Sequence, residues 1–361
     1  MRKLTICLMN PDRSHQLAKN PTSHPWLLVL TGMATLLHKI IKPRPWMPPG
    51  WLLEVAGMTD QLYTIIIWDE LTQQGRLTEE TLPQADIYGI GGLSTSRKRA
   101  YQLSRMIRSL GKKVVAGGID VTGNYLEGNG AELLENFDSI VVGRLTSKLW
   151  QQVLADLSNG ITQKVYQAGP DEPWEFVLPP HYLINPKFYV FTAIRTSAGC
   201  SQNCPFCTVH LVTGGRRIVH CKSQTLLKEE LKLLPKTWFP DLLYDDSFGA
   251  DQNDALEVSL PLLQARGRPW VTEITLKALC GKDGLSGLLD QMVASGCVGV
   301  YVGIENLDRP VSAKSLSREA TEKAIERIHA AGLLILGSFI LDVNGTETPE
   351  SIRETIKWAI A

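Results

Sequence analysis

The chain has 361 residues, of which 44% are hydrophobic and 20% are charged, a balance typical of a globular protein with room for two domains. Lys and Arg together number 37, as do Asp and Glu, so the zero net charge gives no electrostatic argument for a nucleic-acid partner. The longest apolar stretch, Trp26 to Leu37, is too short to span a bilayer, and the first residues lack a secretory-signal pattern, so we expect a cytoplasmic protein without a membrane span.

The first half of the chain alternates short apolar runs with helical patterns. Continuous apolar runs are typical of strands that are buried on both faces of a parallel sheet. The expected strands are Leu4–Met9, Tyr63–Trp68, Ile87–Ile90, Lys113–Ala116 and Ser139–Val142, and the clearest helix is Ser96–Leu110. This pattern predicts a doubly wound, Rossmann-like α/β domain over residues 1–162. Residues 163–187 are rich in Pro and aromatic side chains, have no clear period, and are interpreted as a linker.

The second half, residues 188–361, repeats a strand-loop-helix unit five times. The expected strands are Tyr189–Arg195, Leu242–Tyr244, Trp270–Leu276, Val298–Ile304 and Leu333–Ile340, and Ser317–Ala331 is a clear amphipathic helix. Five such units in sequence predict a partial (β/α) barrel, whose functional residues lie where the strands end. The helix expected at Pro349–Ala361 runs to the terminus without a sixth strand.

The strongest chemical signal is a C-x3-C-x2-C loop directly after a predicted strand, formed by Cys200, Cys204 and Cys207. Three cysteines crowded into eight residues indicate metal or redox chemistry rather than disulfides. Their thiolates can bind three irons of a 4Fe–4S cluster and leave the fourth iron open to another ligand. Gly199, before the first cysteine, suits a loop that wraps closely around a cluster. Zinc held by the three cysteines and His210 is the alternative.

This loop resembles the signature of the radical S-adenosylmethionine superfamily, which follows the first strand of its barrel. The resemblance implies a 4Fe–4S cluster whose open iron binds the methionine part of S-adenosylmethionine, with an aromatic residue, here Phe206, flanking the cofactor near its adenine. One electron from the cluster then cleaves the sulfonium C–S bond, which gives methionine and a 5′-deoxyadenosyl radical. The cluster and the cofactor carry that chemistry, and the protein positions them and excludes water.

Three carboxylates follow predicted barrel strands where the resemblance places cofactor contacts. Asp245 and Asp246 come after the second strand, in a segment similar to one in cobalamin-linked members of the superfamily, and a carboxylate there can accept a bond from the methionine ammonium. Glu305 follows the fourth strand and matches a position that bonds the ribose or amino-acid part of the cofactor. We expect all three side chains to point into the barrel mouth. Capping of the next helix is the alternative for each.

The first half of the chain resembles the cobalamin-binding domain that precedes the barrel in many radical enzymes. In that family the loops after the third and fourth strands face the corrin tail, which places Ser94, Thr95, Gly117 and Gly118 at the cofactor. We expect loops 94–96 and 117–120 to line a cleft facing the barrel mouth. The cobalt-ligating D-x-H-x-x-G loop is absent, and the nearest approach to it, ending at His15, has the wrong spacing. A degenerate, structural domain is the alternative.

The resemblance covers nearly the whole chain, although members of the family normally continue through a sixth barrel strand. We therefore expect either a fragment or a site that a partner completes. The leading hypothesis for function is cobalamin-dependent methyl transfer to an unactivated carbon of a small-molecule substrate, with an external electron donor. A radical cyclase or other rearranging oxidoreductase, and a truncated inactive module that binds only cluster or cobalamin, are the alternatives. The sequence does not identify the substrate.

Overall fold

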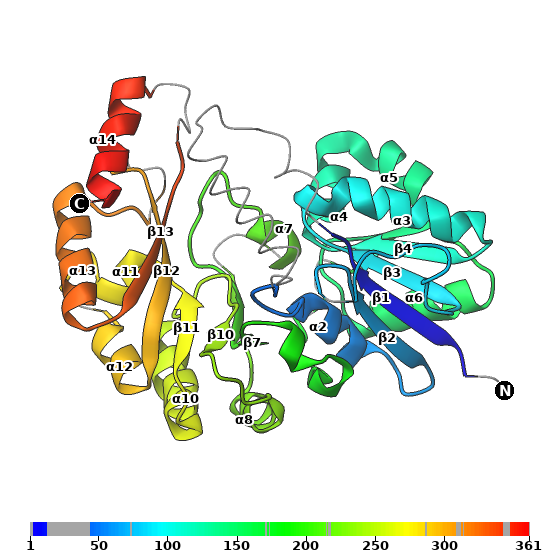
Figure 1. Ribbon diagram of the computed structural model, residues 1–361, viewed down its shortest axis with the longest axis horizontal. Helices are drawn as coiled ribbons and strands as arrows, with labels where there is room; N and C mark the ends of the chain where they lie inside the picture. Colours follow the sequence, from blue (N-terminus) through cyan, green and yellow to red (C-terminus); the bar gives the residue numbers. More distant parts are fainter. Residues whose placement is uncertain are drawn as a thin grey trace, which may run out of the picture. The chain divides into compact units, whose positions relative to one another are not determined.

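The computed structural model describes residues 3–12, 44–72, 74–169, 172, 174–213, 215, 218–285, 287–307, 312, 314–341 and 347–360. The chain divides into two compact units, Met1–Phe191 and Thr192–Ala361. Each unit is built on its own parallel sheet (Figure 1). The fold class expected from the sequence, a Rossmann-like domain followed by a partial barrel, is confirmed.

The first unit holds a six-stranded sheet in the order β2-β1-β3-β4-β5-β6, with every strand pairing parallel to its neighbours. Its strands are β1 (Thr5–Asn10), β2 (Thr64–Asp69), β3 (Ile87–Gly91), β4 (Lys113–Gly117), β5 (Ser139–Val142) and β6 (Val165–Gln167). All five predicted strands are therefore present, each within a residue of its expected bounds. The order reverses between β1 and β3, and doubly wound sheets bind ligands at the carboxyl ends of the strands beside such a point.

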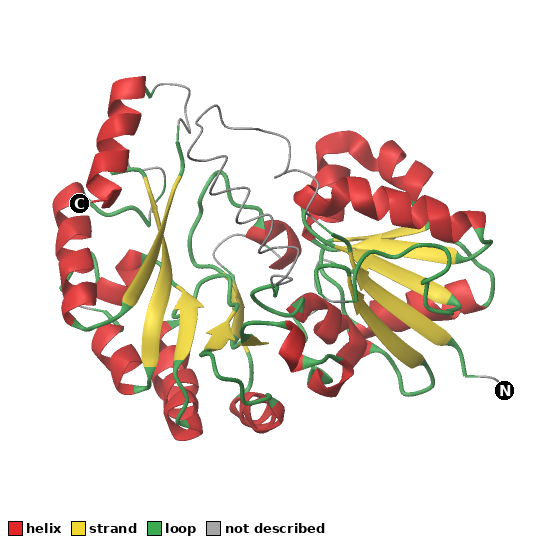
Figure 2. Ribbon diagram, in the orientation of Figure 1, coloured by secondary structure: helices red, strands yellow, loops and turns green. Residues whose placement is uncertain are grey.

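Helices cover both faces of this sheet (Figure 2). One face carries α2 (Gly50–Met58) and α6 (Ser147–Ser158), and the other carries α3 (Arg97–Ser109), α4 (Ile119–Asn124) and α5 (Gly130–Asn136). The helix α6 shows why these segments fold as they do, since Thr146 caps its first turn by accepting a bond from the Leu149 amide, and its apolar side chains recur on one face. The short helical turn η1 (Ser94–Ser96) directly precedes α3. A second one, η2 (Tyr125–Asn129), joins α4 to α5.

The structure differs from the sequence interpretation over residues 163–187. Val165–Gln167 forms β6 and pairs with β5, so the first sheet extends into the segment interpreted as a linker. Three residues are too few to display a hydrophobic period, so the sequence does not predict this strand. The remainder carries two short turns, η3 (His181–Leu183) and η4 (Pro186–Phe188). The Tyr189 hydroxyl then donates to the buried Asp69 carboxylate at the end of β2, which ties this segment back to the first sheet.

The second unit holds a five-stranded parallel sheet in the order β13-β12-β11-β10-β7, so that strands adjacent in the chain are adjacent in the sheet. Its strands are β7 (Thr192–Ile194), β10 (Asp241–Leu243), β11 (Trp270–Glu273), β12 (Cys297–Glu305) and β13 (Leu334–Phe339). The helices between these strands are α8 (Gln224–Leu233), α9 (Gln252–Asp254), η5 (Ala255–Ser259), α10 (Leu260–Arg266), α11 (Leu276–Cys280), α12 (Leu289–Ala294) and α13 (Arg318–Ala330), and α14 (Pro349–Ile360) follows β13. All five predicted barrel strands are present.

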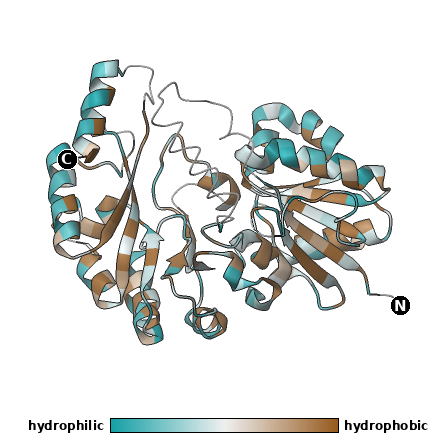
Figure 3. Cartoon of the chain, in the orientation of Figure 1, coloured by the Kyte–Doolittle hydropathy of each residue, from teal (hydrophilic) through white to brown (hydrophobic). Residues whose placement is uncertain are grey.

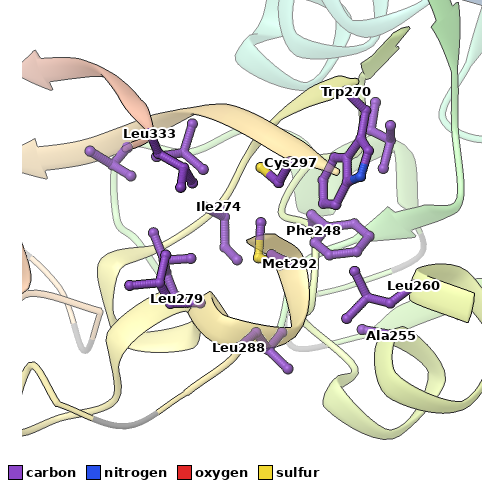
Figure 4. Close-up of a cluster of buried hydrophobic side chains, with 14 of the residues drawn as sticks. Phe248, Ala255, Leu260, Trp270, Ile274, Leu279, Leu288, Met292, Cys297 and Leu333 are labelled. Atoms are coloured by element: carbon purple, nitrogen blue, oxygen red, sulfur yellow. The ribbon is translucent and has the colours of Figure 1, made fainter. Parts of the chain in front are cut away.

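One hydrophobic core lies between this sheet and its helices. Figure 4 shows Trp270 and Phe248 packed beside Leu260 and Met292. The centres of the two aromatic rings are 5.3 Å apart. Cys280 and Cys297 are buried in the same core, and burial raises the pKa of their thiols to about 11 and about 12, as expected for inert cysteines. Figure 3 colours each residue by hydropathy and shows that the strands are mainly hydrophobic, whereas the outer faces of the helices are more polar.

An antiparallel pair, β8 (Ser197–Gly199) and β9 (Val219–Cys221), was not predicted. It branches from the end of β7, because the chain turns at Arg195 and Thr196 instead of continuing the strand that the sequence predicts to Arg195. Both strands have only three residues. In the part of the chain that the structure describes, no helix is long and apolar enough to cross a membrane.

Candidate functional site

The three clustered cysteines lie in the loop that leaves β8 and reaches α7 (Val209–Thr213). None of them forms a disulfide, and Cys204 is the most buried of the three. Burial raises the pKa of the Cys200 thiol, and Cys204 and Cys207 raise it further because a second negative charge nearby is unfavourable. The three thiols line one hollow of about 300 Å³, part of it open to solvent, together with Gln202, Asn203 and His210.

Gly199 makes the entry into this loop possible. Its backbone has a φ of +90°, a conformation that side chains other than hydrogen disfavour. A Cβ at this position would lie 2.2 Å from the carbonyl oxygen of Ile218, the residue just before the facing strand β9. The glycine that the sequence singled out is therefore required by the close approach of β9.

Two carboxylates from the end of β10 hold the base of the cysteine loop. Asp245 is fully buried and accepts bonds from the backbone amides of Thr196 (2.7 Å) and Ser197 (3.0 Å) and from both hydroxyls. Asp246 accepts a bond of 2.7 Å from the amide of Gly199. Both side chains therefore point towards β8 and not towards the outer surface. Asp245 in particular already accepts bonds at both oxygens, and these bonds anchor the turn that leads into β8.

Glu305 ends β12 and is also buried, at 5% exposure. Its carboxylate forms an ion pair with Lys314, in which Nζ lies 2.5 Å from Oε1. The Lys314 ammonium also lies 5.8 Å from the centre of the Phe206 ring, which is 41% exposed. The structure thus brings Glu305 together with the aromatic residue of the cysteine loop.

Lys314 and Glu273 are residues of this site that the sequence analysis did not identify. Glu273 ends β11, and the pKa of its carboxyl rises to about 7, mainly because the surrounding protein removes water from it, with Lys314 lowering the pKa and Asp246 and Glu305 raising it. No hydrogen bond or ion pair holds its side chain among the described residues. Lys314 lies in an irregular segment, where no periodic pattern marks a functional residue. Glu273, in contrast, could have been predicted because it ends a barrel strand.

The three cysteines are candidate ligands for a cluster or for a zinc ion, and the two groups need different arrangements. Across the described ranges, no three side chains of His, Cys, Asp or Glu converge as the ligands of a single metal ion do. A structural zinc ion needs four donors around one point, whereas a 4Fe–4S cluster places each thiolate on a different iron. The three cysteines and His210 line one hollow, on a loop that is fixed at its base.

The candidate cobalamin residues lie at the carboxyl edge of the first sheet. Ser94 and Thr95 are exposed in η1 after β3, and Gly117 and Gly118 end β4 and begin the next loop, with Gly118 exposed. A Cβ on Gly118 would meet no atom within 4 Å, so space is open above this residue. His15 lies outside the described residues.

An ion pair bridges the two loops at this edge. The Arg97 guanidinium donates from Nε and Nη2 to the carboxylate of Asp120, which raises the pKa of Arg97. The pair lines a hollow of about 270 Å³, part of it open to solvent, together with residues that include Leu93, Tyr101 and Gly117. The edge of the sheet therefore has both a charged rim and an apolar recess.

No protein-family model matches the chain. It is 26% identical over 295 residues to bacteriochlorophyllide d C-8(2)-methyltransferase of Chlorobaculum tepidum, covering 76% of this chain and 62% of that protein. It is 24% identical over 349 residues to the C-12(1)-methyltransferase of the same organism, covering 91% and 72%. The chain thus spans less than two thirds of the length of the first of these relatives.

One solved structure has the same fold over nearly the whole chain. It is the radical S-adenosylmethionine methyltransferase TsrM from Kitasatospora setae with cobalamin and a 4Fe–4S cluster bound, with a TM-score of 0.65 and 16% identity over 99% of this chain and 73% of that one. The likeness of fold to this structure agrees with the resemblance that the sequence predicted, an α/β domain followed by a partial barrel.

Proposed function

We propose that this protein is a radical S-adenosylmethionine enzyme that transfers a methyl group to an unactivated carbon of a small molecule with the help of cobalamin. The observation that carries the proposal is the loop of Cys200, Cys204 and Cys207, which opens on one hollow beside the carboxyl ends of a parallel half-barrel. The relatives support the reaction type, because two of them are methyltransferases that act on bacteriochlorophyllide d.

The residues of the second unit divide into two groups in this proposal. The three cysteines hold a 4Fe–4S cluster, and Asp245 and Asp246 fix the loop that carries them. Phe206 and Glu305 receive the cofactor, the first with its exposed ring and the second at the end of β12. Asp246 has one oxygen bonded to Gly199, and no described residue bonds its second oxygen, which would accept from the methionine ammonium.

When bound, the cluster supplies the electron that cleaves S-adenosylmethionine, and the corrin supplies the methyl group that is transferred. The electron itself comes from an external donor of low potential in the reducing cytoplasm. The protein contributes by holding the thiolates on one loop and by presenting carboxylates to the polar groups of the cofactor.

We assign the first domain, residues 1–162, to cobalamin. Ser94, Thr95, Gly117 and Gly118 lie at the edge where doubly wound sheets bind ligands, and open space above Gly118 allows a large ring to approach. The hollow that Arg97 and Asp120 line adds an apolar surface of the kind found in small-molecule sites.

The cluster is tested by anaerobic reconstitution with iron and sulfide. We expect about four iron atoms per chain, with C200A, C204A and C207A each losing the cluster. C280A is the matched control, since that thiol lies in the hydrophobic core and should leave the iron content unchanged. Stoichiometric zinc with no iron would overturn the proposal in favour of a site formed with His210.

Turnover is tested by adding a reductant and S-adenosylmethionine to the reconstituted protein. Methionine and 5′-deoxyadenosine identify reductive cleavage, and S-adenosylhomocysteine identifies methylation of the corrin. Formation of the first two without the third, in the presence of bound cobalamin, would favour a rearranging enzyme over a methyltransferase. Saturable binding of hydroxocobalamin, followed by its absorbance spectrum, tests the first domain separately.

A further inference from the structure

Lys314 is a buried cation in the segment between β12 and α13. Its side chain is 15% exposed, and that of its ion-pair partner Glu305 is 6% exposed. Burying a lone ammonium is costly, so its presence needs compensation from nearby negative charge. Glu305 provides the closest compensation through the 2.5 Å contact.

Lys314 lies beside the cysteine loop. Its ammonium is 5.8 Å from the centre of the ring of Phe206, a residue that stands between Cys204 and Cys207. The ion pair with Glu305 raises the pKa of the Lys314 ammonium, although burial acts in the opposite direction. The lysine therefore places a positive charge next to the loop that carries the three cysteines and at the end of β12.

The backbone is shaped to hold this ion pair in place. Glu305 has a φ of +66°, and no other residue except glycine has a positive φ in the part of the chain that the structure describes. A Cβ on Gly303 would lie 2.2 Å from Glu305 Oε1 and 2.7 Å from Lys314 Nζ, so the pair occupies the space that the glycine leaves. Local strain of this kind persists where the surrounding structure enforces it, and it clusters at functional sites.

We propose that Lys314 is a positioning residue that sets the charge beside the cysteine loop and thereby makes the bound cluster easier to reduce. This inference rests on the proposed function, since it requires that the cysteines hold a 4Fe–4S cluster. Reduction adds an electron to the cluster, and a fixed positive charge nearby stabilises the reduced form. Glu305 partly offsets this effect and keeps the ammonium in place.

The test is the midpoint potential of the reconstituted cluster, followed by electron paramagnetic resonance in a redox titration without S-adenosylmethionine. We expect K314M to have a more negative midpoint than the wild type and K314R to resemble the wild type. E305Q removes a negative charge and should shift the midpoint in the opposite direction. The double variant K314M/E305Q removes one charge of each sign and should return most of the way to the wild-type value.

K323M is the matched control. Lys323 is an exposed lysine of α13 that pairs with Glu319, so its loss should leave the midpoint unchanged. If K314M does not fold, the midpoints of E305Q and K314R test the inference instead. Both variants keep a hydrogen-bond donor and an acceptor at positions 314 and 305, so both should fold. A midpoint in K314M equal to that in K323M, or a shift of E305Q towards negative values, would overturn the inference.

The outcome is distinguishable from failure of the proposed function. A wild-type protein that takes up no iron refutes the cluster itself, whereas a wild-type protein with a normal cluster and no response to Lys314 refutes only the role of the lysine. G303A adds an independent check, because its methyl group displaces the ends of two flexible side chains without removing a charge. Its midpoint should therefore move less than that of K314M.

Discussion

Replacing Gly199 by alanine separates the two reasons for a glycine at the entry to the cysteine loop. The new Cβ would carry the cost of a positive φ, roughly 1–2 kcal/mol, and would also meet the Ile218 carbonyl oxygen at 2.2 Å. Because that atom belongs to the backbone just before β9, it cannot rotate away as the end of a side chain can, and overpacking of this kind costs roughly 1–3 kcal/mol. The sum is about 2–5 kcal/mol, or roughly 4–20 °C in the melting temperature for a unit of this size.

G267A is the matched control for G199A. Gly267 ends α10 in the same unit with a φ of +64°, and a Cβ there meets no atom within 4 Å, so this variant carries the backbone cost alone. Thermal unfolding under anaerobic conditions and iron content after reconstitution are the two measurements. We expect G199A to melt below G267A and to lose most of its iron, while G267A keeps a full cluster. If G199A and G267A had equal melting temperatures and equal iron contents, the contact with the Ile218 carbonyl oxygen would not be what requires a glycine at position 199.

Three further predictions concern other parts of the chain. Lys222 and Glu230 form a buried ion pair that joins β9 to α8, so K222M should destabilise the second unit by about 3–5 kcal/mol in chemical unfolding, and K222M/E230L should recover most of that loss. The raised pKa of Glu273 means that the folded protein holds its proton more tightly than the unfolded chain, so stability falls as the pH rises from about 4.5 to about 7. E273Q should remove this dependence. Although the protein removes much of the water around this carboxyl, part of the residue still reaches solvent, so the variant should be only about 1 kcal/mol more stable than the wild type at pH 8 and equal to it at pH 4. G118A places a methyl group in the open space after β4 and should weaken hydroxocobalamin binding about tenfold, whereas G111A, with a φ of +72° and open space before β4, should bind as the wild type does.

Local sequence determined the strands, the cysteine loop and the fold class. Continuous apolar runs such as Ser139–Val142 have one stable environment, a strand buried on both faces, so the tertiary structure leaves little choice. The C-x3-C-x2-C spacing is a property of eight consecutive residues and needs no knowledge of the remainder of the chain. Short elements without a period, such as β6, β8 and β9, could not be predicted in this way.

Only the tertiary structure decided what the charged residues of the site contact. Asp245 and Asp246 were placed at the barrel mouth from their position after a strand, but their partners, Thr196 and Gly199, lie 49 and 47 residues away and are reached only because β10 pairs with β7. The pairing of Lys314 with Glu305 likewise depends on the turn after β12 and on the space above Gly303. A carboxylate at a strand end can cap a helix, anchor a loop or bind a cofactor. The sequence does not distinguish these roles, because the choice depends on which donors the fold brings within hydrogen-bonding distance.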